Sequence, residues 1–364
     1  MKQVSIGLVA GGYLQEALEY GIRAEKYGFD LVAAYDNLFF WTQGAAYDSW
    51  EPLTLLTMIM SRTRRVKLMT CVIDPVRRHP SMVAHIVSTL DNLAKGRFAV
   101  GIGAGEIANF GPLRDLVERK PLRLCSRLRE FLIVLYGLWN STMEQPFSFD
   151  GEYFRVRNAF YDLKPLTVPH PPVLVGAFGP SMRRLVGEMA DGWLPTTYTP
   201  ETYEKHWNEI KSIGKSAGRG GDAIVPALKQ HSVVLRDGDK AKEEASVRGK
   251  VNLVVRPDLL RALGYRDLAD KASEFAYHRI QTSPLDQGTK PRILEMIPTE
   301  LATRASICGT PDDAIEQIEE FIKAGVRLLV IHPNYEISPR RTSVNETIEN
   351  YRRKILPYFA ELRS

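Results

Sequence analysis

Thr70-Cys71-Val72-Ile73-Asp74-Pro75 closes an apolar run of sequence, and Gly101-Ile102-Gly103-Ala104-Gly105-Glu106 closes a second one further along the chain. The first run ends in a polar turn stopped by proline, and the second ends in glycines before a lone carboxylate. Glycine lets the backbone approach a ligand closely and adopt unusual dihedral angles. We therefore predict that two strand ends meet at one mouth, in loops that suit a cofactor pressed against the backbone.

Short apolar runs typical of strands alternate with amphipathic runs typical of helices from the first residues onward. Several strand runs are continuously apolar, as in a parallel sheet covered on both faces, and no flexible linker divides the series. The sequence therefore predicts one α/β domain over residues 1–364, a closed (β/α)8 TIM barrel. Strands are predicted near 4–9, 31–34, 66–72, 98–101, 173–175, 192–195, 225–235 and 328–331. Helices are predicted near 14–27, 52–62, 80–93, 123–138, 182–189, 200–217, 240–251 and 312–323.

Two segments exceed a minimal barrel and are predicted to be insertions, at approximately 141–172 and 252–306. In the first, aromatic residues alternate on both sides of Asp150-Gly151, which is typical of a β-hairpin. The second is helical, charged and interrupted by prolines. Long insertions in a compact domain usually cover a site or contact another subunit, and the sequence leaves these two roles open.

Composition narrows the class of protein. A net charge of +5 over 364 residues is mild and scattered, so we expect no nucleic-acid partner. The three cysteines, Cys71, Cys125 and Cys308, lack the spacing of a disulfide framework or a metal site, so we expect no metal and a reducing, cytoplasmic setting. No apolar stretch is long enough for a membrane span, and the chain starts without a signal-peptide pattern, so we expect no membrane insertion.

In a TIM barrel the chemistry lies at the carboxyl ends of the strands, so the residues that follow each predicted strand are the candidates. The segment Gly176-Ala177-Phe178-Gly179-Pro180 leads directly into a helix, whose free N–H groups favour a phosphate, although a tight turn would have the same sequence. Arg77 follows the third strand and either binds an anionic group or is a surface charge. The other candidates are Asp36, Asn37, Phe39, Phe40, Trp41, Cys71, Val72, Asp74, Glu106, Asn109, Thr196, Thr197, His332 and Asn334.

Three motifs resemble the luciferase-like flavin and deazaflavin oxidoreductases, in the branch that uses coenzyme F420. They are Asp36-Asn37 with Trp41, the glycine-rich end Gly103-Ala104-Gly105-Glu106, and Val175-Gly176-Ala177-Phe178-Gly179-Pro180 followed by Ala190-Asp191-Gly192-Trp193. The resemblance covers nearly the whole chain. Trp50-Glu51-Pro52 and Arg77-Arg78-His79-Pro80 are similar to the phthiodiolone ketoreductase-like subgroup, more than to the shorter methylenetetrahydromethanopterin reductases.

The resemblance implies coenzyme F420 as the cofactor and a non-prolyl cis peptide bond at Cys71-Val72, behind the central ring of the deazaflavin. It implies that Asp36 lies near the ring edge, that Glu106 faces the ring, and that Gly176 and Ala177 contact the phosphate-bearing side chain. The full set of expected cofactor-binding residues is Asp36, Thr70, Cys71, Val72, Arg77, Glu106, Asn109, Gly176, Ala177, Phe178, Gly179 and Pro180.

The chemistry implied by the resemblance is hydride transfer at C5 of the deazaflavin, together with the movement of one proton. Glu106 is the first candidate for that proton, because a carboxyl near an apolar ring has a raised pKa. The alternative is a structural role, in which the Glu106 carboxylate accepts hydrogen bonds from N–H groups at a helix start. Asn37 stands where alcohol-oxidising relatives carry histidine, and an amide holds a carbonyl without acting as a base. Trp41 is expected to line the substrate pocket, and His79 and His332 are further proton candidates.

We therefore predict an F420-dependent oxidoreductase whose substrate is a small ketone, enone, imine or methylene-pterin. Of the two directions, the sequence favours reduction. Two alternatives are an FMN-dependent monooxygenase of the same superfamily and a non-catalytic barrel that carries a deazaflavin. The apolar helix at 53–60 would suit a homodimer, although a buried helix would have the same sequence.

Overall fold

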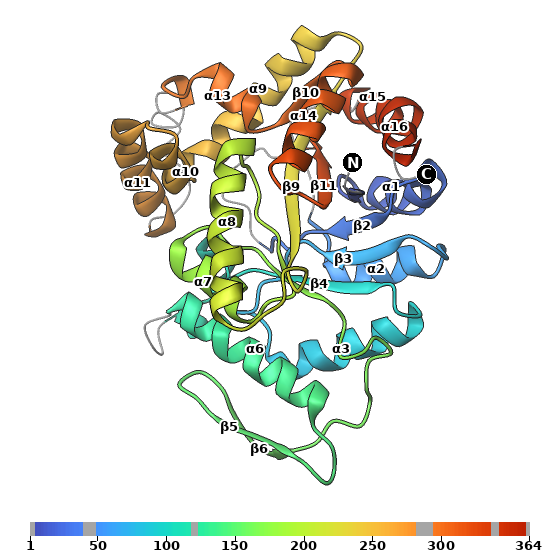
Figure 1. Ribbon diagram of the computed structural model, residues 1–364, viewed down its shortest axis with the longest axis vertical. Helices are drawn as coiled ribbons and strands as arrows, with labels where there is room; N and C mark the ends of the chain where they lie inside the picture. The colour runs from blue at the N-terminus through green and yellow to red at the C-terminus, as the bar shows by residue number, and fades with distance from the viewer. Residues whose placement is uncertain (1–3, 39–48, 118–122, 282–293, 336–341, 362–364) are drawn as a thin grey trace.

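The computed structural model describes residues 4–38, 49–117, 123–281, 294–335 and 342–361. Within these ranges eight parallel strands close into a barrel, with helices around the outside (Figure 1). The predicted TIM-barrel fold is confirmed, and each predicted barrel strand is present. In barrel order the strands are β1 (Ser5–Val9), β2 (Leu31–Ala34), β3 (Lys67–Thr70), β4 (Phe98–Ile102), β7 (Val173–Val175), β8 (Gly192–Trp193), β9 (Val225–Val234) and β11 (Leu328–Pro333).

Helices cover the outside of the barrel strands, and side chains cap the starts of several of them. Thr310 caps α14, where its hydroxyl and the Asp313 carboxylate exchange hydrogen bonds with the backbone of the first turn. His79 caps α3 by accepting a hydrogen bond from Ser81 N. The covering helices are α1 (Leu14–Tyr27), α2 (Pro52–Met60), α3 (Pro80–Leu93), α6 (Leu124–Asn140), α7 (Pro180–Met189), α8 (Pro200–Ser216), α9 (Gly238–Val254) and α14 (Pro311–Lys323).

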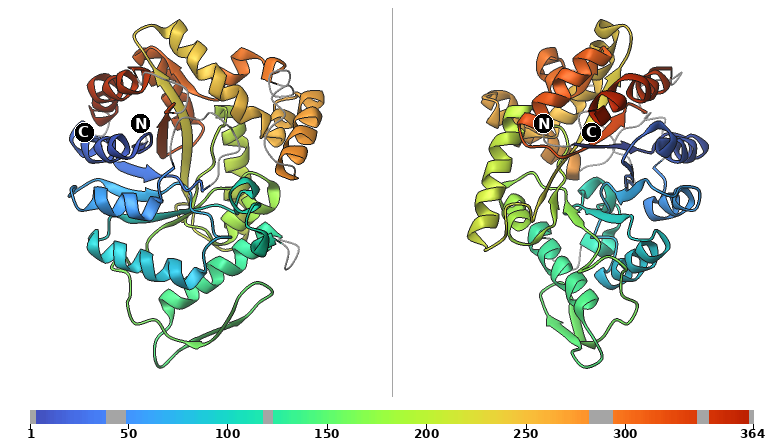
Figure 2. Two further views of the ribbon diagram at one scale, coloured as in Figure 1. Left: turned by 180° about the vertical axis from the view of Figure 1, so that it is seen from behind. Right: turned by 45° about the vertical axis from the view of Figure 1, so that its right-hand side comes forward.

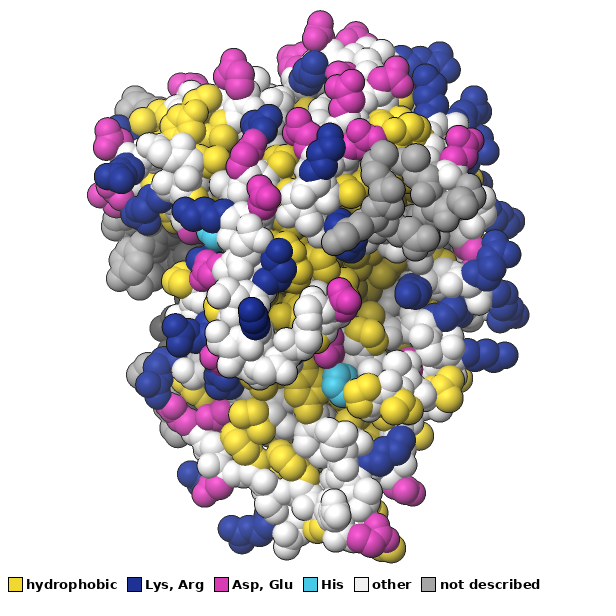
Figure 3. All heavy atoms as spheres, in the orientation of Figure 1, with side chains coloured by type: hydrophobic (Ala, Val, Ile, Leu, Met, Phe, Trp, Pro, Cys, Tyr) yellow, Lys and Arg dark blue, Asp and Glu magenta, His cyan; other side chains and the backbone are white. Residues whose placement is uncertain are grey.

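Side chains alternate between the two faces of each strand and form two apolar layers. The outer layer packs against the helices, and the inner layer fills the barrel, so the barrel is a packed core with a site only at its rim. In the space-filling view, apolar side chains gather in the middle of one face and charged side chains lie around its outline (Figure 3). The inner layer consists of Val9, Leu31, Ala33, Tyr35, Met69, Cys71, Leu174, Leu194, Ala227 and Val330.

The segment 141–172 contains an antiparallel hairpin outside the barrel, formed by β5 (Phe147–Asp150) and β6 (Arg155–Ala159). It projects beside α3 and α6 in every view (Figures 1 and 2). The Glu130 carboxylate of α6 accepts hydrogen bonds from the N–H groups of the hairpin turn, including Tyr153 N at 2.8 Å. The Glu130 carboxylate and the buried Phe154 ring, which packs against Phe131, therefore attach the hairpin to the barrel.

Within its described residues the segment 252–306 contains the helices α10 (Pro257–Ala262), α11 (Arg266–Gln281) and α13 (Thr299–Arg304), which share a small apolar core with the end of α9. A short strand, β10 (Ile307–Gly309), follows and pairs with the end of β9 beyond the barrel. The sequence did not predict β10, nor α4 (Ile107–Phe110), α5 (Arg114–Val117), α15 (Thr342–Asn350), the π-helix η1 (Tyr351–Ile355) and α16 (Leu356–Glu361).

Strands β3 and β4 pack closely at Thr70 and Gly101. The Thr70 hydroxyl donates to Gly101 O at 2.8 Å and accepts from Gly101 N at 2.9 Å, and it is fully buried. A β-carbon on Gly101 would fall well inside contact distance of Thr70 O. The glycine is therefore required by the packing of the two strands.

Replacing Gly101 with alanine is expected to lower the free energy of unfolding by roughly 3 kcal/mol, because the added methyl group meets backbone that cannot rotate away. Chemical denaturation measures this change. Gly220→Ala is the matched control, because its β-carbon meets nothing within 4 Å. Equal stability of the two variants would show that β3 and β4 separate easily.

Candidate active site

The ends of β3 and β4 form one side of the barrel rim. The peptide bond between Cys71 and Val72 is cis. Ile73 N donates to Gly101 O at 2.9 Å, and Gly103 N donates to Ile73 O at 3.0 Å, so the two chains stay paired beyond the strands. A β-carbon on Gly103 would lie 3.0 Å from Val72 Cγ2. Because glycine has no side chain, the Val72 side chain fits against the backbone at this point. The rim here consists of backbone and small side chains.

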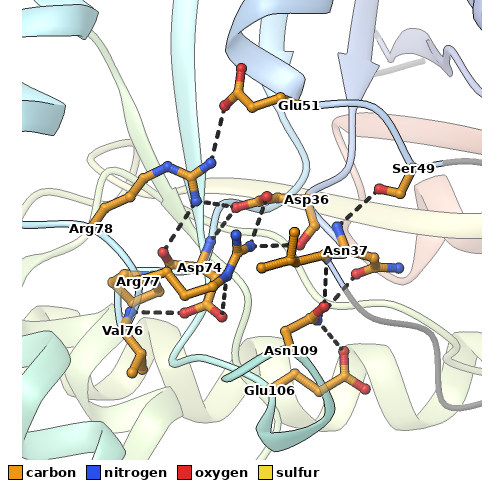
Figure 4. Close-up of polar contacts among 12 residues, drawn as sticks. Asp36, Asn37, Ser49, Glu51, Asp74, Val76, Arg77, Arg78, Glu106 and Asn109 are labelled. Carbon is orange, nitrogen blue, oxygen red and sulfur yellow. Dashed lines mark hydrogen bonds and ion pairs between the residues drawn. The ribbon is translucent and has the colours of Figure 1, made fainter. Parts of the chain in front are cut away.

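Asp36, at the end of β2, is the centre of a buried ionic network (Figure 4). Its carboxylate pairs with Arg77 at 2.8 Å, contacts Arg78, and accepts Asp74 N at 2.9 Å. Arg77 also pairs with Asp74 at 3.2 Å, and Arg78 reaches Glu51 at 3.0 Å. The network joins the loops after β2 and β3. A direct contact of Asp36 or Arg77 with a cofactor stays a prediction.

Asn109 connects two of the predicted catalytic side chains (Figure 4). Its buried amide nitrogen lies 3.3 Å from Glu106 Oε2 and 3.4 Å from Asn37 Oδ1, and its oxygen accepts Leu38 N at 2.8 Å. Asn37 N in turn donates to Ser49 Oγ at 3.0 Å. The structure therefore brings Glu106 and Asn37 together through one amide. Trp41, the third predicted catalytic residue, lies outside the described residues.

The Glu106 side chain is exposed to solvent at the rim, although many protein atoms lie around its carboxyl. Burial raises its pKa above the ordinary value; the Asp74 charge adds to this shift, and Lys229 and Arg248 oppose it. The carboxyl therefore holds a proton to higher pH than an exposed glutamate does. This property suits a group that exchanges a proton near neutrality.

The loop from Gly176 to Pro180 runs from β7 into α7, as the sequence predicts. Gly176 N donates to Ile102 O at 2.9 Å, and Ala177 is buried, with its carbonyl accepting Trp193 Nε1 at 2.9 Å. Gly179 is the N-cap of α7, and a β-carbon there would meet nothing within 4 Å. The helix start is therefore open on the side of Gly179, where an anion would find free N–H groups.

Arg256, between α9 and α10, fixes this loop and was not predicted from the sequence. Its buried guanidinium lies 3.9 Å from the centre of the Phe178 ring and makes two hydrogen bonds of 2.9 Å with Asp258. It also donates to Thr196 O at 2.6 Å and Thr197 O at 3.2 Å, at the end of β8. One side chain thus joins the 252–306 segment to two strand-end loops.

The opposite wall of the rim carries His231 of β9 and His332 of β11, which are register partners with ring centres 4.6 Å apart. The His231 ring bonds Asn334 Oδ1 through Nδ1 at 3.1 Å. Burial lowers the pKa of both imidazoles well below the ordinary value. His332 was a predicted proton candidate and His231 was missed. His79, the other histidine candidate, caps α3 and packs its ring edge-on against Phe154.

The fold and this rim define a (β/α)8-barrel protein with a candidate small-molecule site at the carboxyl ends of its strands. The sequence profile described as luciferase-like monooxygenase matches residues 1–328. The chain therefore belongs to the luciferase-like family. None of the helices within the described ranges is long and apolar enough to cross a bilayer.

Relatives in this family include the phthiodiolone/phenolphthiodiolone dimycocerosates ketoreductase of Mycobacterium tuberculosis, 30% identical over 86% of this chain and 80% of the relative. The 5,10-methylenetetrahydromethanopterin reductase of Archaeoglobus fulgidus is also 30% identical, over 86% of this chain and 88% of the relative. Among solved structures, an F420-dependent secondary alcohol dehydrogenase in complex with an F420-acetone adduct has a TM-score of 0.77 at 23% identity, over 97% of this chain and 98% of that one. The F420-dependent tetrahydromethanopterin reductase of Methanopyrus kandleri has a TM-score of 0.74 at 23% identity, over 98% of this chain and 99% of that one.

Replacing Arg256 with methionine is expected to lower the free energy of unfolding by about 3 kcal/mol, because buried carbonyls and Asp258 lose their partner. Arg261→Met is the matched control, since its ion pair with Asp270 is exposed and contributes about 1 kcal/mol or less. Urea denaturation compares the two variants. Equal losses would mean that the Arg256 contacts add nothing to stability.

Glu106→Gln is expected to make the protein more stable at alkaline pH. A carboxyl whose pKa is raised by folding costs nothing while it is protonated and destabilises the folded state once it ionises. The melting temperature of the variant should exceed that of the parent at about pH 8 and match it at about pH 3, where the carboxyl is protonated in both the folded and the unfolded state. A constant difference across this range would contradict the raised pKa.

Proposed function

We propose that this chain is a coenzyme F420-dependent oxidoreductase that transfers a hydride between the deazaflavin and a small organic substrate, acting as a reductase. The observation that carries the proposal is the agreement between the glycine-lined rim and relatives that reduce a ketone and a methylene-pterin. Two solved structures with the same fold are named as F420-dependent. The substrate itself is a carbonyl, alkene or imine compound of unassigned identity.

The residues of the rim fit such a cofactor. A planar ring needs a wall free of bulky side chains, and Gly103, Gly176 and Val72 leave one, because a β-carbon on either glycine would meet the methyl groups of Val72. A phosphate-bearing tail needs free N–H groups, and the start of α7 at Gly179 is open. In our proposal Cys71-Val72 supports the ring and the Gly176–Pro180 loop holds the tail.

When bound, F420 supplies a hydride at C5 of its ring. Glu106 would hold a proton at the rim and exchange it with solvent, with Asn109 keeping its carboxyl in position. Asn37 offers an amide to the substrate oxygen instead of the histidine of alcohol-oxidising relatives. The Asp36 network keeps the loops after β2 and β3 together while the ligands enter.

The test is an anaerobic titration of the protein with F420 and, separately, with FMN, followed by ligand fluorescence. We expect F420 to bind and FMN to bind at least tenfold more weakly, which corresponds to about 1.4 kcal/mol. Preferential binding of FMN would overturn the cofactor and favour an oxygen-dependent monooxygenase. Binding of F420 without turnover of any carbonyl, alkene or imine tested would instead identify a deazaflavin carrier.

We further propose a cytoplasmic homodimer. The three cysteines are free thiols, as a reducing compartment maintains them, and α2 is largely apolar and exposes Met58. Light scattering of the purified chain would give twice the monomer mass. A monomer at micromolar concentration would contradict the dimer.

A further inference from the structure

Lys229 is a charged residue on the inner face of the barrel. Side chains alternate along a strand, and Ala227 of β9 belongs to the inner apolar layer, so Lys229 and His231 also point inward. Lys229 pairs in register with Val330 of β11, and its N–H donates to Pro195 O at 2.8 Å on the other side. Its backbone is therefore fixed by both neighbouring strands.

The strand registers give the height of Lys229 in the barrel. Inward side chains from alternate strands of a TIM barrel form layers of four. Following the registers around the barrel puts Lys229 in one layer with Val9, Cys71 and Gly176. β9 and β3 are four strands apart in either direction, so Lys229 faces Cys71 across the barrel. Because Gly176 has no side chain and Cys71 a small one, the lysine has room at the centre.

The charges near the rim agree with this position. Burial raises the pKa of Cys71 to about 11, and it also raises that of Glu106; the positive charge of Lys229 opposes both shifts. The same charge helps to lower the pKa of His231 and His332. Lys229 therefore acts on groups at the end of β3, in the loop after β4 and on its own wall, formed by β9 and β11. Its positive charge therefore acts at the ends of strands from both sides of the barrel.

Other groups on this wall cannot supply a proton at neutral pH. His231 and His332 are neutral there, because burial favours their uncharged form. Asn334 is an amide, and so is Asn37 on the facing side. A carbonyl compound between the Cys71-Val72 segment and β9 would turn one face to each. Two cations act on the groups of this side, Lys229 of β9 and Arg248 of α9, and of these two the lysine ammonium is the one that gives up a proton.

We propose that Lys229 is the acid that protonates the carbonyl oxygen of the substrate, an inference that rests on the proposed reductase function. As the carbonyl carbon gains a hydride from the reduced cofactor, the C=O π bond breaks and its electron pair becomes an alkoxide. The alkoxide takes a proton from the Lys229 ammonium, so an O–H bond forms as an N–H bond breaks. The neutral amine then regains a proton from solvent. The substrate class is accordingly a ketone.

The experiment compares Lys229→Met and Lys229→Arg with the parent in the full chain. Lys67→Met is the matched control, because Lys67 also points inward but at the opposite end of the barrel, at the start of β3. We expect Lys229→Met to lower kcat for reduction of acetone, cyclohexanone or acetophenone by about 10²- to 10⁴-fold. Lys229→Arg should keep the parent KM and lose kcat, because arginine keeps the charge but does not release a proton.

A binding readout separates this inference from the proposed function. Isobutyrate, whose carboxylate resembles the alkoxide, should bind to the F420-loaded parent and bind at least tenfold more weakly to Lys229→Met, as read from F420 fluorescence. F420 affinity should stay the same in all variants. A parent that does not bind F420 would defeat the proposed function, whereas parent-like kcat and isobutyrate affinity in Lys229→Met would defeat only the role of Lys229.

Three further results also test the role of Lys229. Loss of F420 binding in Lys229→Met with the fold intact would assign Lys229 to the cofactor and overturn its role as the acid. If Lys229→Met does not fold, Lys229→Arg carries the test, because full kcat in that variant is incompatible with proton donation by residue 229. Rescue of Lys229→Ala by added ethylammonium, with no effect of ethylammonium on the parent, would support the proposal.

Discussion

The site depends on the close approach of β3 and β4 at Thr70 and Gly101. One hydroxyl bonds both backbone groups of Gly101, and the packing leaves no room for a β-carbon. Because the two chains stay paired through Ile73 and Gly103, the loops that follow are held at a fixed distance. Val72, Gly103 and Glu106 therefore share one side of the rim, and their relative positions follow from backbone geometry more than from side-chain contacts.

The rest of the rim is held by charged side chains that do not need to touch a ligand. Asp36 joins the loops after β2 and β3 through Arg77 and Arg78, and Arg256 joins the 252–306 segment to the loops after β7 and β8. Buried pairs of this kind contribute little net stability, but they hold one arrangement of loops, because breaking one leaves a buried charge unpaired. The groups left for chemistry are those on the walls of the rim.

The barrel could be predicted from the sequence because its strands are continuous apolar runs and its helices are strongly amphipathic; the predicted bounds of α1 and α3 agree with the structure. Strand β10 was missed because three residues carry no pattern and it forms only by pairing with β9. Arg256 was missed because its partners come from distant segments. The signal for Lys229 and His231 was available, since they stand two apart in the polar run Lys229-Gln230-His231-Ser232 of a predicted strand and so point to the same face. The neighbourhood of Glu106 and Asn37 was predicted from the motifs, but the bridging amide of Asn109 needed the structure.

The central claim is that the rim formed by β3 and β4 holds a deazaflavin with the β9 wall facing it. A crystal structure of the protein with oxidised F420 tests it most directly. The account predicts the ring against Cys71-Val72, the phosphate at the start of α7 beside Gly179, and Lys229 on the side of the ring away from Val72. A ring bound elsewhere, or one whose open face turns away from β9, would contradict it.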